Sequence, residues 1–241
     1  MKAMLLAAGP GTRLRPFTNH CPKCMVPVAG KPVLQRNIEW LRSNGIIDLV
    51  INLHYYPKAV TSHFGDGSDF GVRLQYSYEP ELLGTAGALW AAHQFFSSEP
   101  FWVIYADNIF DCSLVQMESL HRDRGATLTM GLFWREDVSA SGLVGLDKYS
   151  RITGFKEKPA PHEILSHWVN AGIYLCEAKI HNFIPPHQAS DFGHDILPAM
   201  LSAGESMYGY TLGHGETLHW IDTPEDLAHT AAALQEGPAP G

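Results

Sequence analysis

The chain has 241 residues, of which 45% are hydrophobic, so it is long and apolar enough to bury a core as one large domain or two small ones. Its formal net charge is -8, its sequence pI is about 5.9, and no run of lysines or arginines occurs. Nucleic-acid binders usually carry a basic face, so we expect no nucleic-acid partner.

The cysteines and the apolar runs indicate the compartment. The four cysteines are too few for a disulfide scaffold in a chain of this length. The apolar stretch at residues 3–8 is shorter than the roughly 7–15 residues of a secretory signal, and no run approaches the roughly 20 residues of a membrane span. We therefore expect a cytoplasmic protein without a membrane partner. The sequence leaves open whether the protein forms a homo-oligomer.

The first half of the chain alternates strands and helices. The pattern predicts a strand at 2–8, a helix at 31–45, a strand at 46–53, a helix at 56–65, a strand at 72–78, a helix at 85–96 and a strand at 101–106. The helix at 31–45 has a proline near its start and a glycine at its end, which is the expected punctuation. This β-α-β order is typical of a parallel, doubly wound sheet.

The second half is richer in strands. They are predicted at 126–134, 142–147, 151–157 and 167–176, with helices at 191–203 and 224–235 and a flexible tail at 236–241. No linker or internal repeat separates the halves. We therefore predict one α/β domain over residues 1–235, with a Rossmann-like, doubly wound mixed sheet whose two halves each bind one ligand.

A glycine loop follows the first predicted strand, in "LAAGPGTRLRPFT" at residues 6–18. Gly9 and Gly11 allow a tight bend that brings backbone N–H groups near an anion, and Arg13 and Arg15 follow. Neither known phosphate motif fits, because the dinucleotide fingerprint needs glycine where Leu14 stands and the Walker loop needs a lysine. The loop predicts phosphate binding. The alternative is a glycine turn with solvated arginines.

This loop, together with "PKCMVPVAGKPVL" at 22–34, closely resembles the signature of the sugar-1-phosphate nucleotidylyltransferases, the NDP-sugar pyrophosphorylases. The segments 79–89, 155–159, 168–175 and 220–227 are similar to further family segments, in the same order, so the resemblance covers roughly residues 2–230. The chain resembles the short form of the family, to which the mannose- and heptose-1-phosphate guanylyltransferases are similar. The resemblance implies the nucleotide-diphospho-sugar transferase fold without the C-terminal left-handed β-helix of some members.

The resemblance implies conversion of an NTP and a sugar 1-phosphate to an NDP-sugar and pyrophosphate. The attacking phosphate oxygen is already an anion, so we expect catalysis by positioning and by cations, without a general base. By resemblance, Arg13 holds the β- and γ-phosphates, Lys23 lies at the α-phosphate and Lys158 grips the sugar phosphate. The alternatives are a surface lysine for Lys23 and, for Lys158, a strand-end lysine paired with Glu157.

A magnesium ion would bridge the phosphates and needs hard oxygen ligands. Asp107 follows the predicted strand at 101–106, and Asp222 matches the family's second metal aspartate. Either could instead cap a helix or lie in a turn. Asp111 is predicted to be a turn or cap residue. The family commonly has glycine at Ala106, so the extra methyl group here could crowd the ribose or shift the metal.

The resemblance also implies the remaining site residues. About residues 1–125 form the nucleotide-binding half, and the implied contacts are Leu6, Ala7, Gly9, Gly11, Thr12, Arg13, Lys23, Glu79, Gly84, Thr85 and Gly87. About residues 126–235 form the sugar-phosphate-binding half, with Gly142, Glu157, Lys158 and Asn170. A plain small-residue helix start is the alternative for "GTAG" at 84–87.

GTP with a mannose- or heptose-type 1-phosphate fits the short form. dTTP or UTP with a hexose 1-phosphate is the alternative, as is a catalytically silent nucleotide-sugar-binding regulatory subunit. A phosphocholine substrate would need an aromatic cage, to which Trp168 and Tyr174 could contribute.

Cys21 and Cys24 stand in C-x-x-C spacing around Pro22 and Lys23. A structural zinc site needs four ligands, and no second pair lies nearby, while a redox pair is expected at the start of a helix. None of the 13 histidines has a metal-ligand spacing either. The important feature of this stretch is therefore the Pro-Lys pair. Two thiols beside a catalytic lysine also suggest sensitivity to oxidation.

Overall fold

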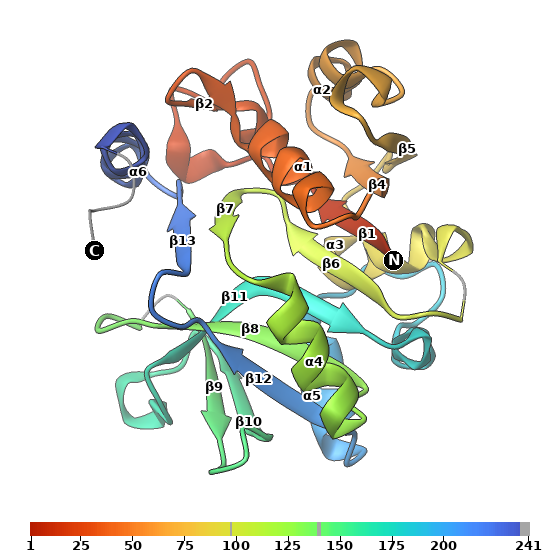
Figure 1. The fold of residues 1–241 in the computed structure, drawn as a ribbon, viewed down its shortest axis with the longest axis vertical. Helices are drawn as coiled ribbons and strands as arrows, with labels where there is room; N and C mark the ends of the chain where they lie inside the picture. The colour runs from red at the N-terminus through yellow and green to blue at the C-terminus, as the bar shows by residue number, and fades with distance from the viewer. Residues whose placement is uncertain (97, 139–140, 237–241) are drawn as a thin grey trace. The chain divides into compact units, whose positions relative to one another are not determined.

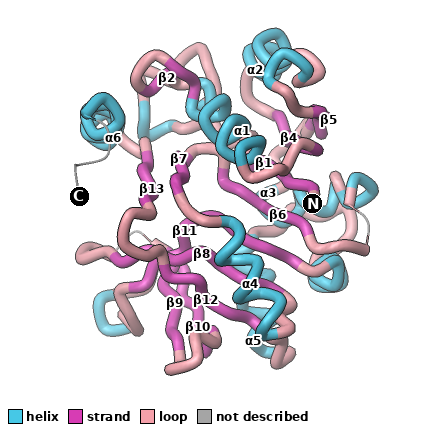
Figure 2. The backbone as a smooth tube through the Cα atoms, viewed as in Figure 1, coloured by secondary structure: helices cyan, strands magenta, loops and turns pink. Residues whose placement is uncertain are grey.

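The computed structural model describes residues 1–96, 98–138 and 141–236 (Figure 1). As predicted, the fold is α/β with a mixed sheet, and Figure 2 marks its helices in cyan and its strands in magenta. The chain divides into two compact units. Unit 1 is Met1–Met4, Leu83–Ile104 and Cys112–Glu216, and unit 2 is Leu5–Leu82, Tyr105–Asp111 and Thr217–Gly241. One domain with two functional halves stays a prediction.

Unit 2 contains a short parallel sheet and two small antiparallel ribbons. Its strands and helices are the end of β1 (Lys2–Leu6), β2 (Pro27–Val28), β3 (Lys31–Pro32), α1 (Val33–Ser43), β4 (Asp48–Leu53), α2 (Pro57–Phe64), β5 (Arg73–Tyr78), β7 (Asn108–Asp111), β13 (Thr217–Trp220) and α6 (Pro224–Glu236). β4 pairs in parallel with β5, whereas β13 pairs antiparallel with β7 and β2 with β3. The β13–β7 ribbon joins two parts of the chain that are distant in sequence.

Unit 1 is built around β11, which pairs antiparallel with β6, β8 and β9. Its elements are α3 (Gly84–Ala91), β6 (Phe101–Tyr105), α4 (Leu114–Arg124), β8 (Leu128–Trp134), β9 (Gly142–Leu146), β10 (Ile152–Glu157), β11 (Trp168–Cys176), a π-helix at Phe192–Ile196, α5 (Leu197–Ser202) and β12 (Met207–Thr211). β12 pairs in parallel with β8, so the sheet is mixed. α4 packs on β8, β11 and β12, and α5 packs on β10.

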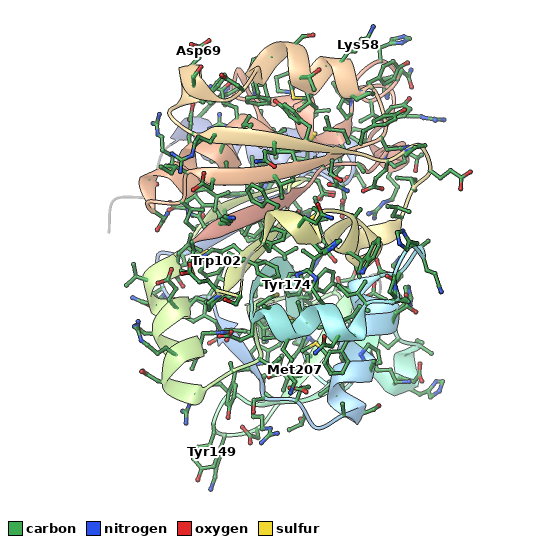
Figure 3. The ribbon with its side chains drawn as sticks, turned by 90° about the vertical axis from the view of Figure 1, so that its right-hand side faces the viewer. Lys58, Asp69, Trp102, Tyr149, Tyr174 and Met207 are labelled. Atoms are coloured by element: carbon green, nitrogen blue, oxygen red, sulfur yellow. The ribbon has the colours of Figure 1, made fainter. Side chains whose placement is uncertain are left out.

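Each unit has its own apolar core. In unit 1, Trp102, Tyr174 and Met207, labelled in Figure 3, have no exposed surface. In unit 2, one cluster joins segments from the two ends and the middle of the chain: Leu14, Val26, Val28, Val33, Ile109, Ile221 and Leu227. Burying a side chain of this size stabilises the folded state by about 1.5–3 kcal/mol. This cluster therefore fixes the loops that carry its members.

The predicted elements are found, with their ends shifted by a few residues. The helix predicted at 31–45 begins at Val33, because residues 31–32 pair with 27–28 in a hairpin. The helix predicted at 191–203 is a π-helix followed by a short α-helix. The predicted tail begins at Glu236, which ends α6, and its residues 237–241 lie outside the described residues.

Among the strands and α-helices that the structure describes, six escaped prediction: β2, β3, β7, α4, β12 and β13. The prediction that Asp111 is a turn or cap residue is wrong, because Asp111 ends β7. The cap of α4 is Ser113, whose hydroxyl accepts a hydrogen bond from the Gln116 N–H. Within the described residues, no helix is long and apolar enough to cross a membrane.

His181 in unit 1 is a half-buried residue whose ring is packed inside the protein. Both ring nitrogens are inaccessible to solvent and lack a hydrogen bond among the described residues. The ring stacks on Phe101, with centroids 5.5 Å apart. Burial lowers the pKa of His181 below its ordinary value of 6.5, and nearby His93 lowers it further. The folded state therefore favours the neutral ring.

We predict that His181→Phe makes the stability of the protein less dependent on pH. Because the pKa of His181 is lowered on folding, its contribution is present above pH 6.5 and is lost as pH falls through the lowered pKa. Denaturant unfolding at pH 7.5, 6.5 and 5.5 measures the effect, which is at most about 1.4 kcal/mol per pH unit for one proton. His214→Phe, at an exposed position, is the control. Equal slopes for wild type and His181→Phe would contradict the prediction.

Candidate functional site

The strongest cluster of charged groups in the described part of unit 2 surrounds Lys23. Its ammonium nitrogen Nζ lies 2.7 Å from Asp107 Oδ2 and 2.5 Å from Asp222 Oδ1. Arg13 Nη2 lies 3.2 Å from Asp222 Oδ2. The Lys23 side chain is 8% exposed, whereas the two aspartates are 37% and 31% exposed. The structure thus brings together four of the five residues predicted to be catalytic.

The loop geometry explains how Lys23 reaches the two carboxylates. Pro22, with φ -69°, precedes a short 3-10 helix at Lys23–Met25. Gly11 has φ +60°, and a Cβ atom there would lie 2.7 Å from Lys23 Cβ. The glycine therefore lets the lysine stem pass close to the loop. Nothing lies within 4 Å of a Cβ built on Gly9, which leaves that position open.

The apolar cluster of unit 2 holds each charged side chain in place. Arg13 precedes Leu14, Asp222 follows Ile221, and Asp107 and Lys23 lie within three residues of Ile109 and Val26. All four apolar neighbours belong to the same buried cluster. Packing of apolar side chains thus sets the positions from which the charged groups converge.

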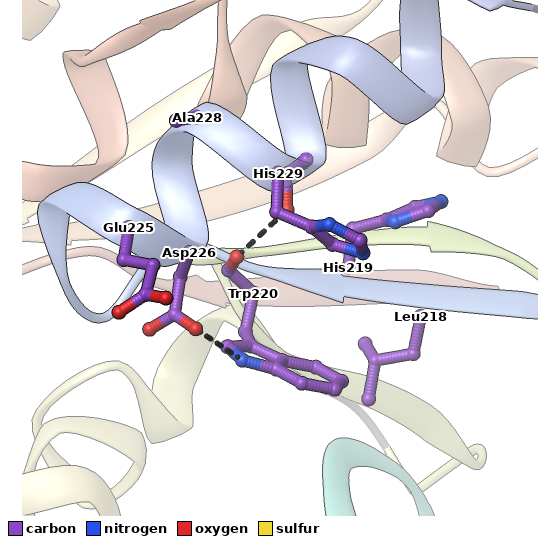
Figure 4. Close-up of a pocket in the computed structure, with 8 residues that line it drawn as sticks. Leu218, His219, Trp220, Glu225, Asp226, Ala228 and His229 are labelled. Atoms are coloured by element: carbon purple, nitrogen blue, oxygen red, sulfur yellow. Dashed lines mark hydrogen bonds between the residues drawn. The ribbon is translucent and has the colours of Figure 1, made fainter.

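The segment after β13 orients Asp222. Thr223 caps α6, because its hydroxyl accepts from the Asp226 N–H and its own N–H donates to Asp226 Oδ2. The alternative that Asp222 caps this helix is therefore wrong. The Trp220 indole N–H donates to Asp226 Oδ1, at 3.0 Å (Figure 4).

The same segment borders an open pocket of about 610 Å³ in unit 2. Figure 4 shows residues that line it, and the lining is Leu218, His219, Trp220, Glu225, Asp226, Ala228, His229 and Thr230. None of the residues predicted from the sequence to bind substrate or metal belongs to this lining. The pocket is therefore separate from the charged cluster around Lys23.

The electrostatics of Lys23 favour its charged form. Burial acts to lower the pKa of Lys23, but Asp107 and Asp222 together outweigh burial and raise that pKa above its ordinary value. The alternative of a solvated surface lysine is wrong. Two carboxylates that converge on one cation are also a donor set of hard oxygens, the kind that Mg²⁺ prefers. No group of three or more possible metal-ligating side chains exists among the described residues.

Hydrogen bonds in unit 2 connect two predicted nucleotide contacts, Ala7 and Glu79, through Asn52. The Ala7 N–H donates to Asn52 Oδ1 at 2.7 Å, and Asn52 Nδ2 donates to Glu79 Oε1 at 2.8 Å. All three residues are buried. The Leu6 carbonyl accepts from the N–H of Ala106, whose side chain is fully buried. Asn52 was missed, although a lone asparagine inside the apolar strand "LVINL" was a signal.

The predicted nucleotide contacts at the start of α3 lie in unit 1. Their two glycines, Gly84 and Gly87, allow close packing against the backbone of residues 188–190. A Cβ on Gly84 would overlap the carbonyl oxygen of Ser190, and one on Gly87 would lie 2.7 Å from the Gln188 carbonyl oxygen. The Ser190 carbonyl accepts hydrogen bonds from the N–H groups of Ala86 and Gly87. Close backbone packing thus requires these glycines, whatever ligand α3 contacts.

The predicted sugar contacts are also in unit 1. A Cβ on Gly142 would lie 2.6 Å from Glu157 Oε2, so the carboxylate fills the space beside this glycine. Lys158 is exposed and has φ +44°, and its N–H donates to the Ser141 carbonyl. Among the described residues, its side chain forms no ion pair with Glu157. Asn170 lies at a β-bulge.

The Asn170 side chain donates to the Tyr174 hydroxyl and accepts from the Gly172 N–H. Tyr174 is fully buried and stacks on Phe192, so it cannot form part of an open aromatic cage. This removes the basis for the phosphocholine alternative.

Cys21 and Cys24, the C-x-x-C pair, form neither a disulfide nor a metal site with other described residues. All four cysteines are free thiols. Burial raises the pKa of both Cys21 and Cys24, which lowers the thiolate fraction at neutral pH. The Cys21 thiol donates a weak hydrogen bond to the Phe17 carbonyl. Both observations argue against a reactive pair.

We predict that Gly84→Ala destabilises the protein more than Gly204→Ala does. Both glycines have nearly equal positive φ, +72° and +73°, but only Gly84 meets backbone atoms. The left-handed backbone costs about 1–2 kcal/mol at either position, and the overlap with Ser190 adds about 1–3 kcal/mol at Gly84 alone. Denaturant unfolding of both variants measures the difference. Equal losses would mean that the close approach to Ser190 is not a constraint.

Comparison with known proteins agrees with the motifs. The family described as Nucleotidyl transferase matches residues 2–236. The UTP–glucose-1-phosphate uridylyltransferase of Synechocystis sp. is 36% identical over 235 residues, which are 92% of this chain and 60% of that protein. The mannose-1-phosphate guanylyltransferase of Mycobacterium tuberculosis is 32% identical over 241 residues, 99% of this chain and 66% of that protein. The chain thus spans less than two thirds of the length of these relatives.

Solved structures share the fold. A Bacillus anthracis protein described as a glucose-1-phosphate thymidylyltransferase, solved in complex with a sucrose, superposes with a TM-score of 0.87 at 24% identity over 100% of this chain and 97% of that one. HddC from Yersinia pseudotuberculosis, complexed with GMP-PN, gives 0.78 at 24% identity over 96% and 98%. These likenesses confirm the predicted fold class. Because the family model covers residues 2–236, the chain belongs to the Nucleotidyl transferase family.

Proposed function

We propose that this protein is a sugar-1-phosphate nucleotidylyltransferase, which converts an NTP and a sugar 1-phosphate to an NDP-sugar and pyrophosphate. The observation that carries the proposal is the buried Lys23 ammonium held by Asp107 and Asp222, with Arg13 beside them. Clustered cations are what this reaction needs, because two anionic substrates meet and negative charge moves to the leaving group.

Each cationic side chain has a proposed task. Arg13 binds the β- and γ-phosphates through its planar guanidinium, and Lys23 stabilises charge at the α-phosphate. The glycine loop around Gly9 contributes backbone N–H groups to the triphosphate. Lys158 binds the phosphate of the sugar substrate, whose oxygen attacks the α-phosphorus in line. Since this oxygen is already ionised, no side chain has to remove a proton.

Asp107 and Asp222 are the proposed ligands of Mg²⁺. Their oxygens already share one cationic partner, which supports a cation site of hard oxygen donors. The bound ion would supply positive charge to the triphosphate and its leaving group. In the structure, the Lys23 ammonium pairs with both carboxylates, and the Arg13 guanidinium pairs with that of Asp222.

The nucleotide and sugar are proposed from relatives. The similarity to the mannose-1-phosphate guanylyltransferase of Mycobacterium tuberculosis supports GTP with a mannose- or heptose-type 1-phosphate. The similarity to the uridylyltransferase of Synechocystis sp. supports UTP with glucose 1-phosphate as a second candidate. In either case Glu157 and Asn170 hydrogen-bond sugar hydroxyls, and the base lies near Glu79, Gly84 and Thr85.

A substrate panel tests the reaction and separates the candidates. GTP, UTP and dTTP are each combined with mannose, heptose and glucose 1-phosphates, and pyrophosphate release is measured with Mg²⁺ present. We expect the highest kcat/KM with GTP and a mannose- or heptose-type substrate. Nucleotide binding without turnover in every combination would instead support a silent regulatory subunit.

We predict that Lys23→Ala lowers kcat by about 10²–10³-fold, the usual loss when one group that stabilises transition-state charge is removed. The same change leaves two carboxylates without their ammonium partner. We therefore expect Lys23→Ala to bind Mn²⁺ more tightly than wild type when no nucleotide is present, measured by the EPR signal of free Mn²⁺.

Two variants control this experiment. Asp107→Asn should lower both turnover and Mn²⁺ affinity, because it removes one proposed ligand. Lys31→Ala removes a partly exposed lysine that pairs with Glu39 and should change neither turnover nor Mn²⁺ affinity. Near wild-type turnover in Lys23→Ala or in Asp107→Asn would refute the assignment of these residues.

A further inference from the structure

The carboxylate of Glu157 lies in a slot between two glycines of unit 1. Its Oε2 atom is 2.6 Å from the position of a Cβ on Gly142 and 2.8 Å from that of a Cβ on Gly193. Gly142 opens β9, which pairs with the end of β10 opposite Glu157. Gly193 comes from the π-helix Phe192–Ile196 and is buried. The carboxylate occupies volume that any other residue at either position would take.

Gly193 is itself held by Asp191. Asp191 Oδ1 accepts hydrogen bonds from the N–H groups of Gly193, at 2.8 Å, and His194, at 3.3 Å. Its other oxygen accepts from the Thr85 hydroxyl, at 2.8 Å, and Thr85 Oγ1 accepts in turn from the Phe192 N–H. The turn that carries Gly193 is thereby fastened to the first turn of α3, which contains the proposed nucleotide contacts.

Glu157 remains available to a ligand. Among the described residues, no side chain or backbone group donates a hydrogen bond to its carboxylate in the structure. Burial raises the pKa of Glu157, while Lys158 and His194 act to lower it and Asp191 to raise it. A half-buried acceptor without a donor is costly unless a ligand supplies one.

We propose that Gly193, fastened by Asp191, is a specificity-determining positioning residue that sets where Glu157 accepts a hydrogen bond from a hydroxyl group of the sugar substrate. The inference rests on the proposed function and extends it to a residue outside the family motifs identified in the sequence. Gly193 acts through Glu157 and does not itself have to contact the sugar.

Gly193→Ala is a selective probe of this role. The φ angle of Gly193 lies outside the left-handed region, so alanine fits the backbone, and the nearest atom to the new methyl group is the movable end of Glu157. We expect the KM for sugar 1-phosphate to rise about tenfold, with the KM for the NTP changed less than about twofold. KM does not depend on the fraction of enzyme that is folded, so partial unfolding cannot imitate the result.

Gly154→Ala is the matched control. Gly154 lies on the same strand as Glu157, and nothing approaches within 4 Å of a Cβ built there. Both KM values of Gly154→Ala should equal those of wild type. A Gly193→Ala enzyme whose sugar KM also equals that of wild type would overturn the proposal.

A double-mutant cycle with Glu157→Ala completes the test. If Gly193 acts through Glu157, Gly193→Ala should not raise the sugar KM further in the Glu157→Ala enzyme. A full tenfold increase in that background would overturn the inference while leaving the proposed function intact. Absence of NDP-sugar formation by the wild-type enzyme would overturn both, so the two failures are distinguishable.

Discussion

The shared ion pair of Lys23 constrains much of unit 2. Asp107 and Asp222 are 84 and 199 residues away from Lys23 in sequence, yet both carboxylates contact its buried ammonium. Removing such a charge from water is costly and is offset only when its partners are in position. The apolar cluster that includes Leu14, Val26, Ile109 and Ile221 provides these positions. Hydrophobic packing and charge placement are thus parts of one arrangement.

Glycines in both units make room for other groups in a way that motif comparison does not show. The conformation of Gly11 and its lack of a side chain let the stem of Lys23 pass close to the loop. Gly84 gives space to the Ser190 carbonyl, and Gly193 gives space to the carboxylate of Glu157. In each case the missing side chain makes room for another part of the protein. A glycine in a binding motif can therefore position a functional group without touching the ligand.

The elements that could be predicted from the sequence are those formed by interactions between residues close together in the chain. Strands such as β4 and β6 are continuous apolar runs, so their pattern is visible locally. Helix α4 was missed because its surface is mostly polar and only Leu114, Met117 and His121 are buried. The strands β7 and β13 are short and pair with each other across a long separation in sequence. Their pairing, and with it the position of Asp222, depends on contacts that no local pattern encodes.

The sequence by itself determined the family and named the charged residues of the cluster around Lys23. It could do so because the glycine loop and the Pro-Lys motif are contiguous and their spacing is specific. It also determined which runs form the core strands. Only the tertiary structure decided that Lys23 is buried between two aspartates, that Thr223 rather than Asp222 caps α6, and that Asn52 and Asp191 link predicted site residues. These are contacts between segments distant in sequence, or choices among neighbouring polar groups, and packing in three dimensions selects them.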